Sequence, residues 1–122
     1  MAVATNTGSV ATKTLLVSTG TSILVTVPVN TSASLFQTAN ATVTGSGTTV
    51  LFLGRVISNS DSNCQVDISI DGVSIYSGSS GQQIIARATL PLGSHTVTYT
   101  AYALNSDVTV TTAGLTVIDL GL

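Results

Sequence analysis

Charge is the scarcest property of this 122-residue chain. Three Lys or Arg and five Asp make only 7% of the residues charged, where about 25% is usual in a soluble domain. Three cations and a net charge of −2 cannot supply the basic surface that binds nucleic acid. Because 43% of the residues are hydrophobic and the net charge is low, the chain can bury a core. This balance excludes intrinsic disorder.

Several further absences limit what the chain can be. The single Cys64 cannot form an intrachain disulfide, and with the single His95 it leaves too few ligands for a zinc site. We therefore expect no cofactor. No apolar run approaches the ~20 residues of a membrane-spanning helix, and the N-terminal residues lack the basic and apolar regions of a secretion signal. The length fits one domain.

Hydroxyl and β-branched side chains take the place of charge. The sequence contains 21 Thr, 16 Ser, 15 Val and 8 Ile, and β-branched side chains favour a pleated sheet over a helix. In residues 64–71 apolar and polar residues alternate strictly, and residues 95–101 and 106–111 repeat this period. A two-residue period is typical of half-buried strands. The sequence predicts an all-β protein with no significant helix.

Turn residues separate the predicted strands. Asp71-Gly72 is typical of a two-residue hairpin loop, since both positions tolerate positive φ, and residues 91–94 are typical of a turn. Many short strands in one domain predict an antiparallel β-sandwich or jelly roll over residues 14–122. The expected strands are 14–18, 22–29, 33–37, 40–44, 48–58, 64–71, 73–77, 82–89, 95–104, 106–112 and 114–120.

Residues 1–13 differ from the rest because they are small, polar and weakly patterned. One interpretation is a frayed terminus. The other is an N-terminal arm that lies on a neighbouring subunit and pairs with a strand edge there. In that case Val3, Val10 and Lys13 are the candidate contact residues.

Four segments of the second half occur in a characteristic order. They are residues 49–56, residues 66–72 ending in IDG, residues 90–97 with the sequence LPLGSHTV, and residues 115–121 with the sequence LTVIDLG. This series resembles the tumour-necrosis-factor-like jelly rolls of bacteriophage tail and capsid-decoration proteins. The resemblance implies a jelly roll that forms a homotrimer about a threefold axis and has no catalytic activity.

Composition favours an oligomer independently of that resemblance. A surface with few charges has little protection against association, since well-behaved surfaces carry ~25–35% charged residues. Strand edges are normally guarded by Lys, Pro or bulges, and only Lys13, Pro28 and Pro91 are available for that role. A closed symmetric oligomer covers both edges and apolar faces. We therefore expect self-association rather than a monomer.

Candidate catalytic residues are few. His95 has many serines and five aspartates as candidate partners, so a Ser-His-Asp arrangement stays open. The sequence has no nucleophile-elbow pattern, however, and the simpler interpretation is that His95 begins a strand after a turn. Cys64 lies on the apolar side of its strand and is expected to be buried and inert.

An oxygen-rich cluster is the one candidate metal site. Asp61, Asn63, Asp67 and Asp71 lie within eleven residues, and calcium takes six to eight oxygen ligands. The spacing does not match an EF-hand loop, which needs Gly at its sixth position and Glu at its twelfth. Asp67 and Asp71 also belong to the polar face of a predicted strand. We therefore predict no metal site.

Carbohydrate recognition is the main functional alternative, because β-sandwiches host many lectins and sugars commonly stack on aromatic side chains. Tyr99 and Tyr102 lie on opposite faces of their strand by parity, so one is expected in the core and the other on the surface. Tyr76 and Tyr102 are the candidate contacts to a glycan receptor. Ice binding by ranks of Thr requires a regular repeat that the chain lacks, and a fimbrial adhesin requires a secretion signal.

These observations lead to one prediction and one alternative. We predict a non-enzymatic virion structural protein, a capsid decoration or cement protein that trimerises and binds the major capsid protein or another virion protein. It is assembled in the host cytoplasm and lies on the virion surface, where the N-terminal arm adds contacts to the capsid. The alternative is the receptor- or carbohydrate-binding tip of a phage tail fibre. Neither nucleic acid nor a membrane is an expected partner.

Overall fold

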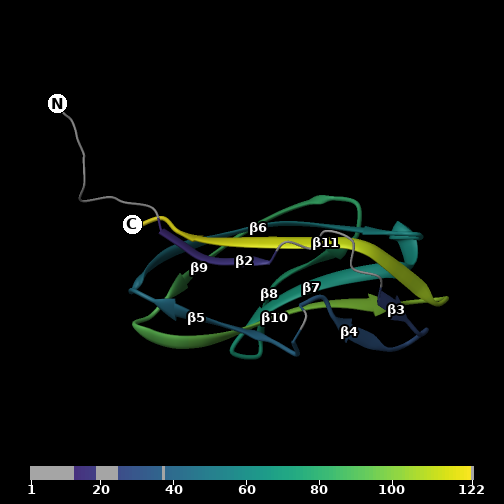
Figure 1. Ribbon diagram of the computed structural model, residues 1–122, viewed down its shortest axis with the longest axis horizontal. Helices are drawn as coiled ribbons and strands as arrows, with labels where there is room; N and C mark the ends of the chain where they lie inside the picture. Colours follow the sequence, from purple (N-terminus) through teal and green to yellow (C-terminus); the bar gives the residue numbers. More distant parts are fainter. Residues whose placement is uncertain (1–12, 19–24, 37, 122) are drawn as a thin grey trace.

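The computed structural model describes residues 13–18, 25–36 and 38–121, which form two antiparallel β-sheets packed against each other (Figure 1). The first sheet contains β2 (Lys13–Ser18), β3 (Val25–Val27), β6 (Thr48–Ser58), β9 (Gln83–Leu90) and β11 (Val108–Asp119). Its strand order is β2-β11-β6-β9, and β3 also pairs with β11. We call it the β11 sheet.

The second sheet contains β4 (Ser32–Ser34), β5 (Ala41–Gly45), β7 (Cys64–Ile70), β8 (Val73–Ser79) and β10 (Gly93–Ala103). Its order is β4-β10-β7-β8, with β5 also on β10, and we call it the β10 sheet. The only helical element of the described residues is a 3₁₀ turn, η1 (Asp61–Asn63). No helix in this part of the chain has the length and apolar character needed to cross a membrane. The prediction of an all-β antiparallel sandwich is confirmed.

The alternating pattern explains how the sheets pack. Along β7 every second residue from Cys64 to Ile70 is buried, as the two-residue period predicts. β10 and β11 alternate in the same way, so each sheet presents one apolar face to the other. The largest fully buried side chains are Tyr99, Phe52, Ile68, Ile84, Leu90, Leu115 and several valines.

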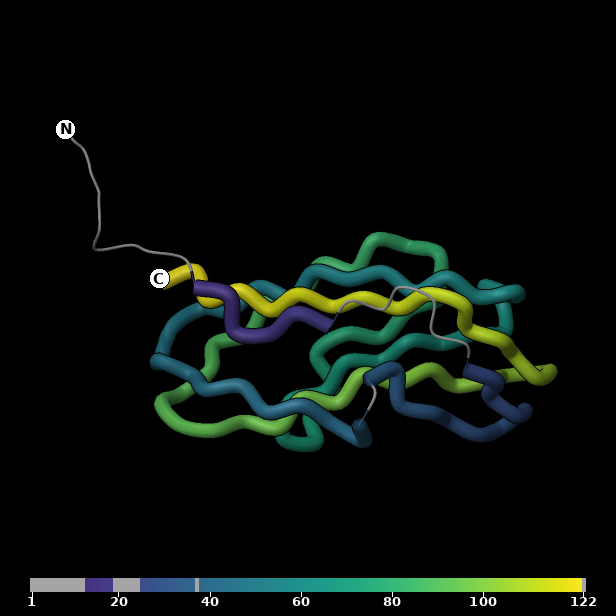
Figure 2. Tube along the Cα trace, viewed as in Figure 1, coloured from purple at the N-terminus to yellow at the C-terminus, as the bar shows by residue number. Residues whose placement is uncertain are grey.

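The prediction of two strands at 106–112 and 114–120 is wrong, because both belong to β11. Gly114 separates the two predicted strands, but it lies within β11 and pairs with Arg55 of β6. Figure 2 shows β11, in yellow, following β6 along its length. A Gly inside a strand often marks a bulge or a close approach of another group. Here the register shifts between Val110 and Thr112, and a tyrosine hydroxyl approaches the Gly114 carbonyl.

That tyrosine is Tyr99, which joins the two sheets. Its ring is fully buried on β10, and its hydroxyl donates to the carbonyl oxygen of Gly114 in the β11 sheet at 2.9 Å. Burial raises the pKa of the Tyr99 phenol far above its ordinary value. The prediction that one of Tyr99 and Tyr102 is core and the other surface is confirmed, since Tyr102 is 37% exposed.

Several strand ends differ from the prediction. β8 continues to Ser79, although the serine and glycine content of residues 77–81 predicts a loop. β10 begins at Gly93, so the preceding turn is shorter than the predicted 91–94. β3 and β4 are shorter than the predicted 22–29 and 33–37, and residues 22–24 lie outside the described residues.

Candidate functional site

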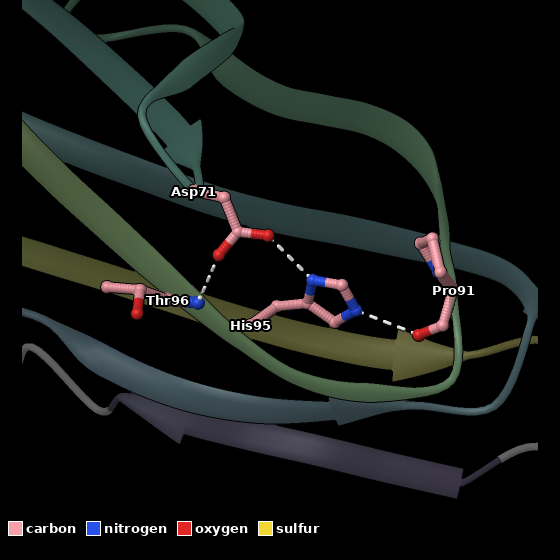
Figure 3. Close-up of polar contacts among 4 residues, drawn as sticks. All are labelled: Asp71, Pro91, His95 and Thr96. Carbon is pink, nitrogen blue, oxygen red and sulfur yellow. Dashed lines mark hydrogen bonds and ion pairs between the residues drawn. The ribbon is translucent and has the colours of Figure 1, made fainter.

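One end of the sandwich holds a polar cluster around His95 (Figure 3). His95 follows Gly93 on β10 and shares the parity of the buried Val97, so its side chain lies at the rim of the core and is only 12% exposed. Its Nδ1 lies 2.7 Å from Asp71 Oδ2, and its Nε2 lies 2.8 Å from the carbonyl oxygen of Pro91. We call Asp71, His95 and Pro91 the turn clamp, because they join the β7–β8 turn to the β9–β10 turn.

The local sequence places Asp71 for this role. Asp71 and Gly72 have φ angles of 51° and 84°, as expected for the predicted two-residue hairpin loop, which is confirmed. The backbone N–H of Asp71 donates to the carbonyl oxygen of Thr96 at 2.8 Å. In return, the N–H of Thr96 donates to Asp71 Oδ1 at 2.9 Å. Asp71 is therefore tied to β10 by its backbone and by both carboxylate oxygens.

The geometry of the turn clamp favours a protonated imidazole. Both ring nitrogens of His95 face oxygen acceptors, and only the imidazolium can donate from both nitrogens at once. The hydrogen bond that His95 donates to Asp71 is the main cause that raises the pKa of His95 above 6.5, and the Pro91 carbonyl acts in the same direction. The same hydrogen bond, which Asp71 accepts from His95, is the main cause that lowers the pKa of Asp71 below 3.8.

The turn clamp is not a Ser-His-Asp triad. In a triad the second ring nitrogen accepts a hydrogen bond from a serine hydroxyl, whereas His95 Nε2 faces the Pro91 carbonyl. His95 does lie near the start of a strand, as predicted. Its contacts hold two turns in a fixed relation, which is a structural task.

The other aspartates also accept hydrogen bonds from within the chain. Asp61 accepts from Ser80 at 2.6 Å, and Asp67 accepts from Ser69 at 2.8 Å and from Ser74 at 2.7 Å. The backbone N–H of Val29 donates to Asp107 at 2.9 Å. Hydroxyls and backbone N–H groups thus donate the hydrogen bonds to carboxylates that Lys and Arg donate in more highly charged proteins.

The oxygen-rich cluster does not converge. Asp61 lies before β7 and Asp71 lies after it, so the whole strand separates them. Within the described part of the chain no three His, Cys, Asp or Glu side chains are placed to share a metal ion. Asp71 is also not an ordinary solvated residue of a strand face, because it belongs to the turn clamp.

Asp119 is a buried acid that the sequence interpretation missed. Its residue is 5% exposed, and its Oδ1 accepts from the Thr48 hydroxyl at 2.6 Å and from the N–H of Gly121 at 2.8 Å. The Thr48 bond is the main cause that lowers the pKa of Asp119. The two-residue period of the strand indicates this burial, because Leu115, Val117 and Asp119 are every second residue of β11 and share its inward face.

The predicted contact residues do not form one site. Val3 and Val10 lie outside the described residues, while Lys13 begins β2 and pairs with Asp119 of β11, so it belongs to the sandwich rather than to an arm. Tyr102 faces outward beside Gln65. Tyr76 pairs with the buried Ile68 and packs against the core. The two tyrosines therefore lie on opposite faces of the β10 sheet.

The outer faces of the two sheets differ in chemistry. The outward residues of the β10 sheet are mainly hydroxyl-bearing or polar, and we call this surface the hydroxyl face; its central members are Thr98, Thr100, Ser69, Asp67 and Gln65. The outward residues of the β11 sheet combine large aliphatic side chains with Thr, Arg and Gln, and we call this surface the aliphatic face after its aliphatic members. Its apolar members are Val17, Leu51, Leu53, Ile57, Ile85 and Ile118.

A shallow groove of about 370 Å³ crosses the aliphatic face. Gly114 leaves its floor without a side chain, and Val17, Leu53, Arg55 and Gln83 are among the residues around it. Val17 and Ile85 are 56% and 62% exposed. Exposed apolar side chains that gather around a groove indicate a candidate interaction site.

Comparison with known proteins does not place this chain in a family. No family model matches it, and neither a curated protein nor a solved structure matches it. A proposal about function therefore depends on the residues and geometry described above.

Proposed function

We propose that this chain is a non-enzymatic structural protein of a bacteriophage virion. In this role it is a capsid decoration or cement protein that forms a homotrimer, binds the major capsid protein or another virion protein, and stabilises the virion surface after assembly in the host cytoplasm. The observation that carries the proposal is the uncovered aliphatic face on a chain with only eight charged residues. Such a surface favours burial against protein.

Strand pairing supports the jelly-roll form of the sandwich. A jelly roll behaves as a long antiparallel hairpin rolled into two sheets, so that early strands pair with late ones. Here β2 pairs with β11, β5 with β10, β6 with β9, and β7 with β8. This nested order agrees with the resemblance to tumour-necrosis-factor-like jelly rolls.

The segments that carry the resemblance also support it by their positions. Residues 49–56 lie in β6, residues 66–72 lie in β7 and its turn, residues 93–97 lie in β10, and residues 115–119 lie in β11. These four strands are the central strands of the two sheets. The resemblance thus covers the framework of the sandwich.

A receptor-binding tip of a tail fibre is the second candidate function. Tyr102 favours it, because this aromatic ring is 37% exposed on the hydroxyl face, where it pairs with Ser32 and Gln65. A glycan has the hydroxyl groups that such neighbours bind. Tyr76 does not belong to this surface, since it packs toward the core.

Cosedimentation with capsids separates the two candidates. Purified protein is mixed with capsids of the encoding phage that lack it, and bound protein is measured against concentration. A decoration protein saturates in a fixed ratio to the capsid subunit and raises the temperature at which capsids rupture. The absence of binding, together with glycan-array binding that Tyr102→Ala abolishes, would overturn decoration in favour of the tail-fibre role.

A further inference from the structure

Two exposed apolar surfaces of this chain complement each other. We propose that the groove on the aliphatic face of one copy receives the corner of a second copy, where the corner is Val73 and Leu92 at the turn ends of β8 and β9. This contact rests on the proposed homotrimer and names the surfaces that form it.

The aliphatic face offers an apolar row that one Thr interrupts. Thr116 of β11 pairs with Val17 of β2 on one side and with Leu53 of β6 on the other, and Leu53 pairs with Ile85 of β9. This row crosses all four strands, with only Thr116 carrying a polar atom. The groove runs beside it, over Gly114. A water occupies about 30 Å³ of liquid, so a groove of about 370 Å³ exchanges many waters for apolar atoms when it is filled.

The corner offers side chains that can fill the groove. Leu92 is 81% exposed and Val73 is 66% exposed, the two highest exposures among the large hydrophobic side chains described. Val73 follows the Asp71-Gly72 turn, and Leu92 follows Pro91. The turn clamp joins these two turns through Asp71, His95 and Pro91. Because the turns are fixed before contact, little conformational freedom is lost on association.

Charge favours contact between the face and the corner over contact between two faces. The charged side chains on the described aliphatic face are Arg55 and Arg87, so two such faces would bring like charges together. The corner adjoins the Asp71–His95 pair, in which the carboxylate side chain is 52% exposed and the imidazole only 12%, so the pair presents its negative end to solvent beside Val73. Arg55 lines the groove. A carboxylate on the corner therefore meets a guanidinium at the groove.

The symmetry of a trimer requires a contact of this type. A contact between two different surfaces is heterologous, and it closes into a ring when the rotation permits. A contact between two identical faces gives pairs. The edge strand β8 also lacks Lys, Pro and every charged residue, so the irregularity in its pairing at Ile68 and Ser69 is left as its guard against association. A second copy that covers the corner shields the start of this edge.

Light scattering over a concentration series tests the contact with one variant on each surface. Leu53→Lys places a charge beside the groove, and Leu92→Asp places one on the corner; both side chains point outward, so circular dichroism and melting should stay near wild type. Loss of a central contact at an interface raises the dissociation constant by about thirtyfold or more. The matched controls are Thr98→Lys on the hydroxyl face and Leu104→Asp at the other end of β10, which should leave association unchanged.

Mixing the two variants tests the heterologous geometry. A Leu92→Asp copy keeps its groove, and a Leu53→Lys copy keeps its corner, so one native contact forms between them. Of the other two contacts in a mixed trimer, one pairs Asp with Lys and one carries a single substitution. We expect association to recover in the mixture, although each variant alone is monomeric.

Three results would overturn the inference. They are a wild-type mass of 12.3 kDa at every concentration, association unaffected by both variants, and the absence of recovery on mixing. Capsid cosedimentation is scored separately. Capsid binding by a monomeric chain would overturn the contact and the trimer but keep the virion role. A trimer that does not bind capsids would keep the contact and overturn the virion role.

Discussion

Replacement of Tyr99 by Phe tests the hydrogen bond that joins the two sheets. The Tyr99 hydroxyl donates to the carbonyl oxygen of Gly114 at 2.9 Å, and the next acceptor, the carbonyl of Arg55, is 3.5 Å away. Phe preserves the ring, including its tilted contact with Phe36 at a centroid distance of 5.7 Å. The substitution therefore removes one buried hydrogen bond and almost nothing else.

The expected cost follows from the position of this bond. Removing one partner of a buried hydrogen bond costs about 1–3 kcal/mol, because the remaining group stays desolvated. At about 2.1 cal/mol/K per residue, a chain of this length has an unfolding entropy near 0.26 kcal/mol/K, so Tm should fall by about 4–12 °C. Calorimetry and urea denaturation measure this loss.

Tyr102→Phe is the matched control, because it removes the same atom from a side chain that is 37% exposed. Surface substitutions usually change stability by less than about 0.5 kcal/mol. Equal melting temperatures for Tyr99→Phe and wild type would refute the reasoning. An equal loss in both variants would refute it as well, since burial would then have no effect.

Three further predictions concern the turn clamp, the buried acid and a close backbone approach. The pKa of His95 is raised above its ordinary 6.5, and that of Asp71 is lowered below its ordinary 3.8. The turn clamp therefore contributes its full stabilisation between pH 3.8 and pH 6.5. Its contribution is lost as pH rises through the pKa of folded His95, and on the acid side as pH falls through that of folded Asp71. Urea midpoints from pH 5 to 9 should therefore fall at the alkaline end, and His95→Gln should remove most of that slope. Asp119→Ala leaves the Thr48 hydroxyl and the Gly121 N–H without their acceptor, so the free energy of unfolding should drop by about 1–3 kcal/mol; a urea midpoint equal to wild type would contradict this. Gly54→Ala should destabilise by about 1–3 kcal/mol, because its Cβ would lie 2.7 Å from the Gly114 oxygen; calorimetry that shows no loss would mean that the strands separate easily.

The sheet framework is accessible from the sequence because its signals are local. Strict alternation in residues 64–71 predicts β7 and its inward face, and Asp71-Gly72 predicts the turn that follows. Gly114 shows the limit of such signals. Read locally, this glycine ends a strand, whereas its actual environment is set by Tyr99 from the opposite sheet. A contact between residues distant in sequence can turn an apparent break into the middle of a strand.

The turn clamp is less accessible for the same reason. His95 and Asp71 are separated by 24 positions, and only the antiparallel pairing of β10 with β7 brings them together. Parity alone places His95 on the core side of β10, as it places Asp119 on the core side of β11. Neither placement reveals the hydrogen-bond partners that satisfy the polar side chain there.

The chain has few charges because hydrogen bonds from uncharged groups satisfy most of its aspartate carboxylates. Each of the five aspartates accepts at least one hydrogen bond from a hydroxyl, an imidazole or a backbone N–H of the same chain. A Thr or Ser donor adds no net charge, so the acids are satisfied without Lys or Arg partners on the surface. This leaves the outer faces free of mixed charge, which normally opposes association. Of the two faces, the aliphatic one gains more from losing its water, because it exposes Val17, Ile57 and Ile85, whereas the hydroxyl face presents mainly groups that bind water well. In the proposed assembly, the β11 sheet is therefore the face that a partner covers.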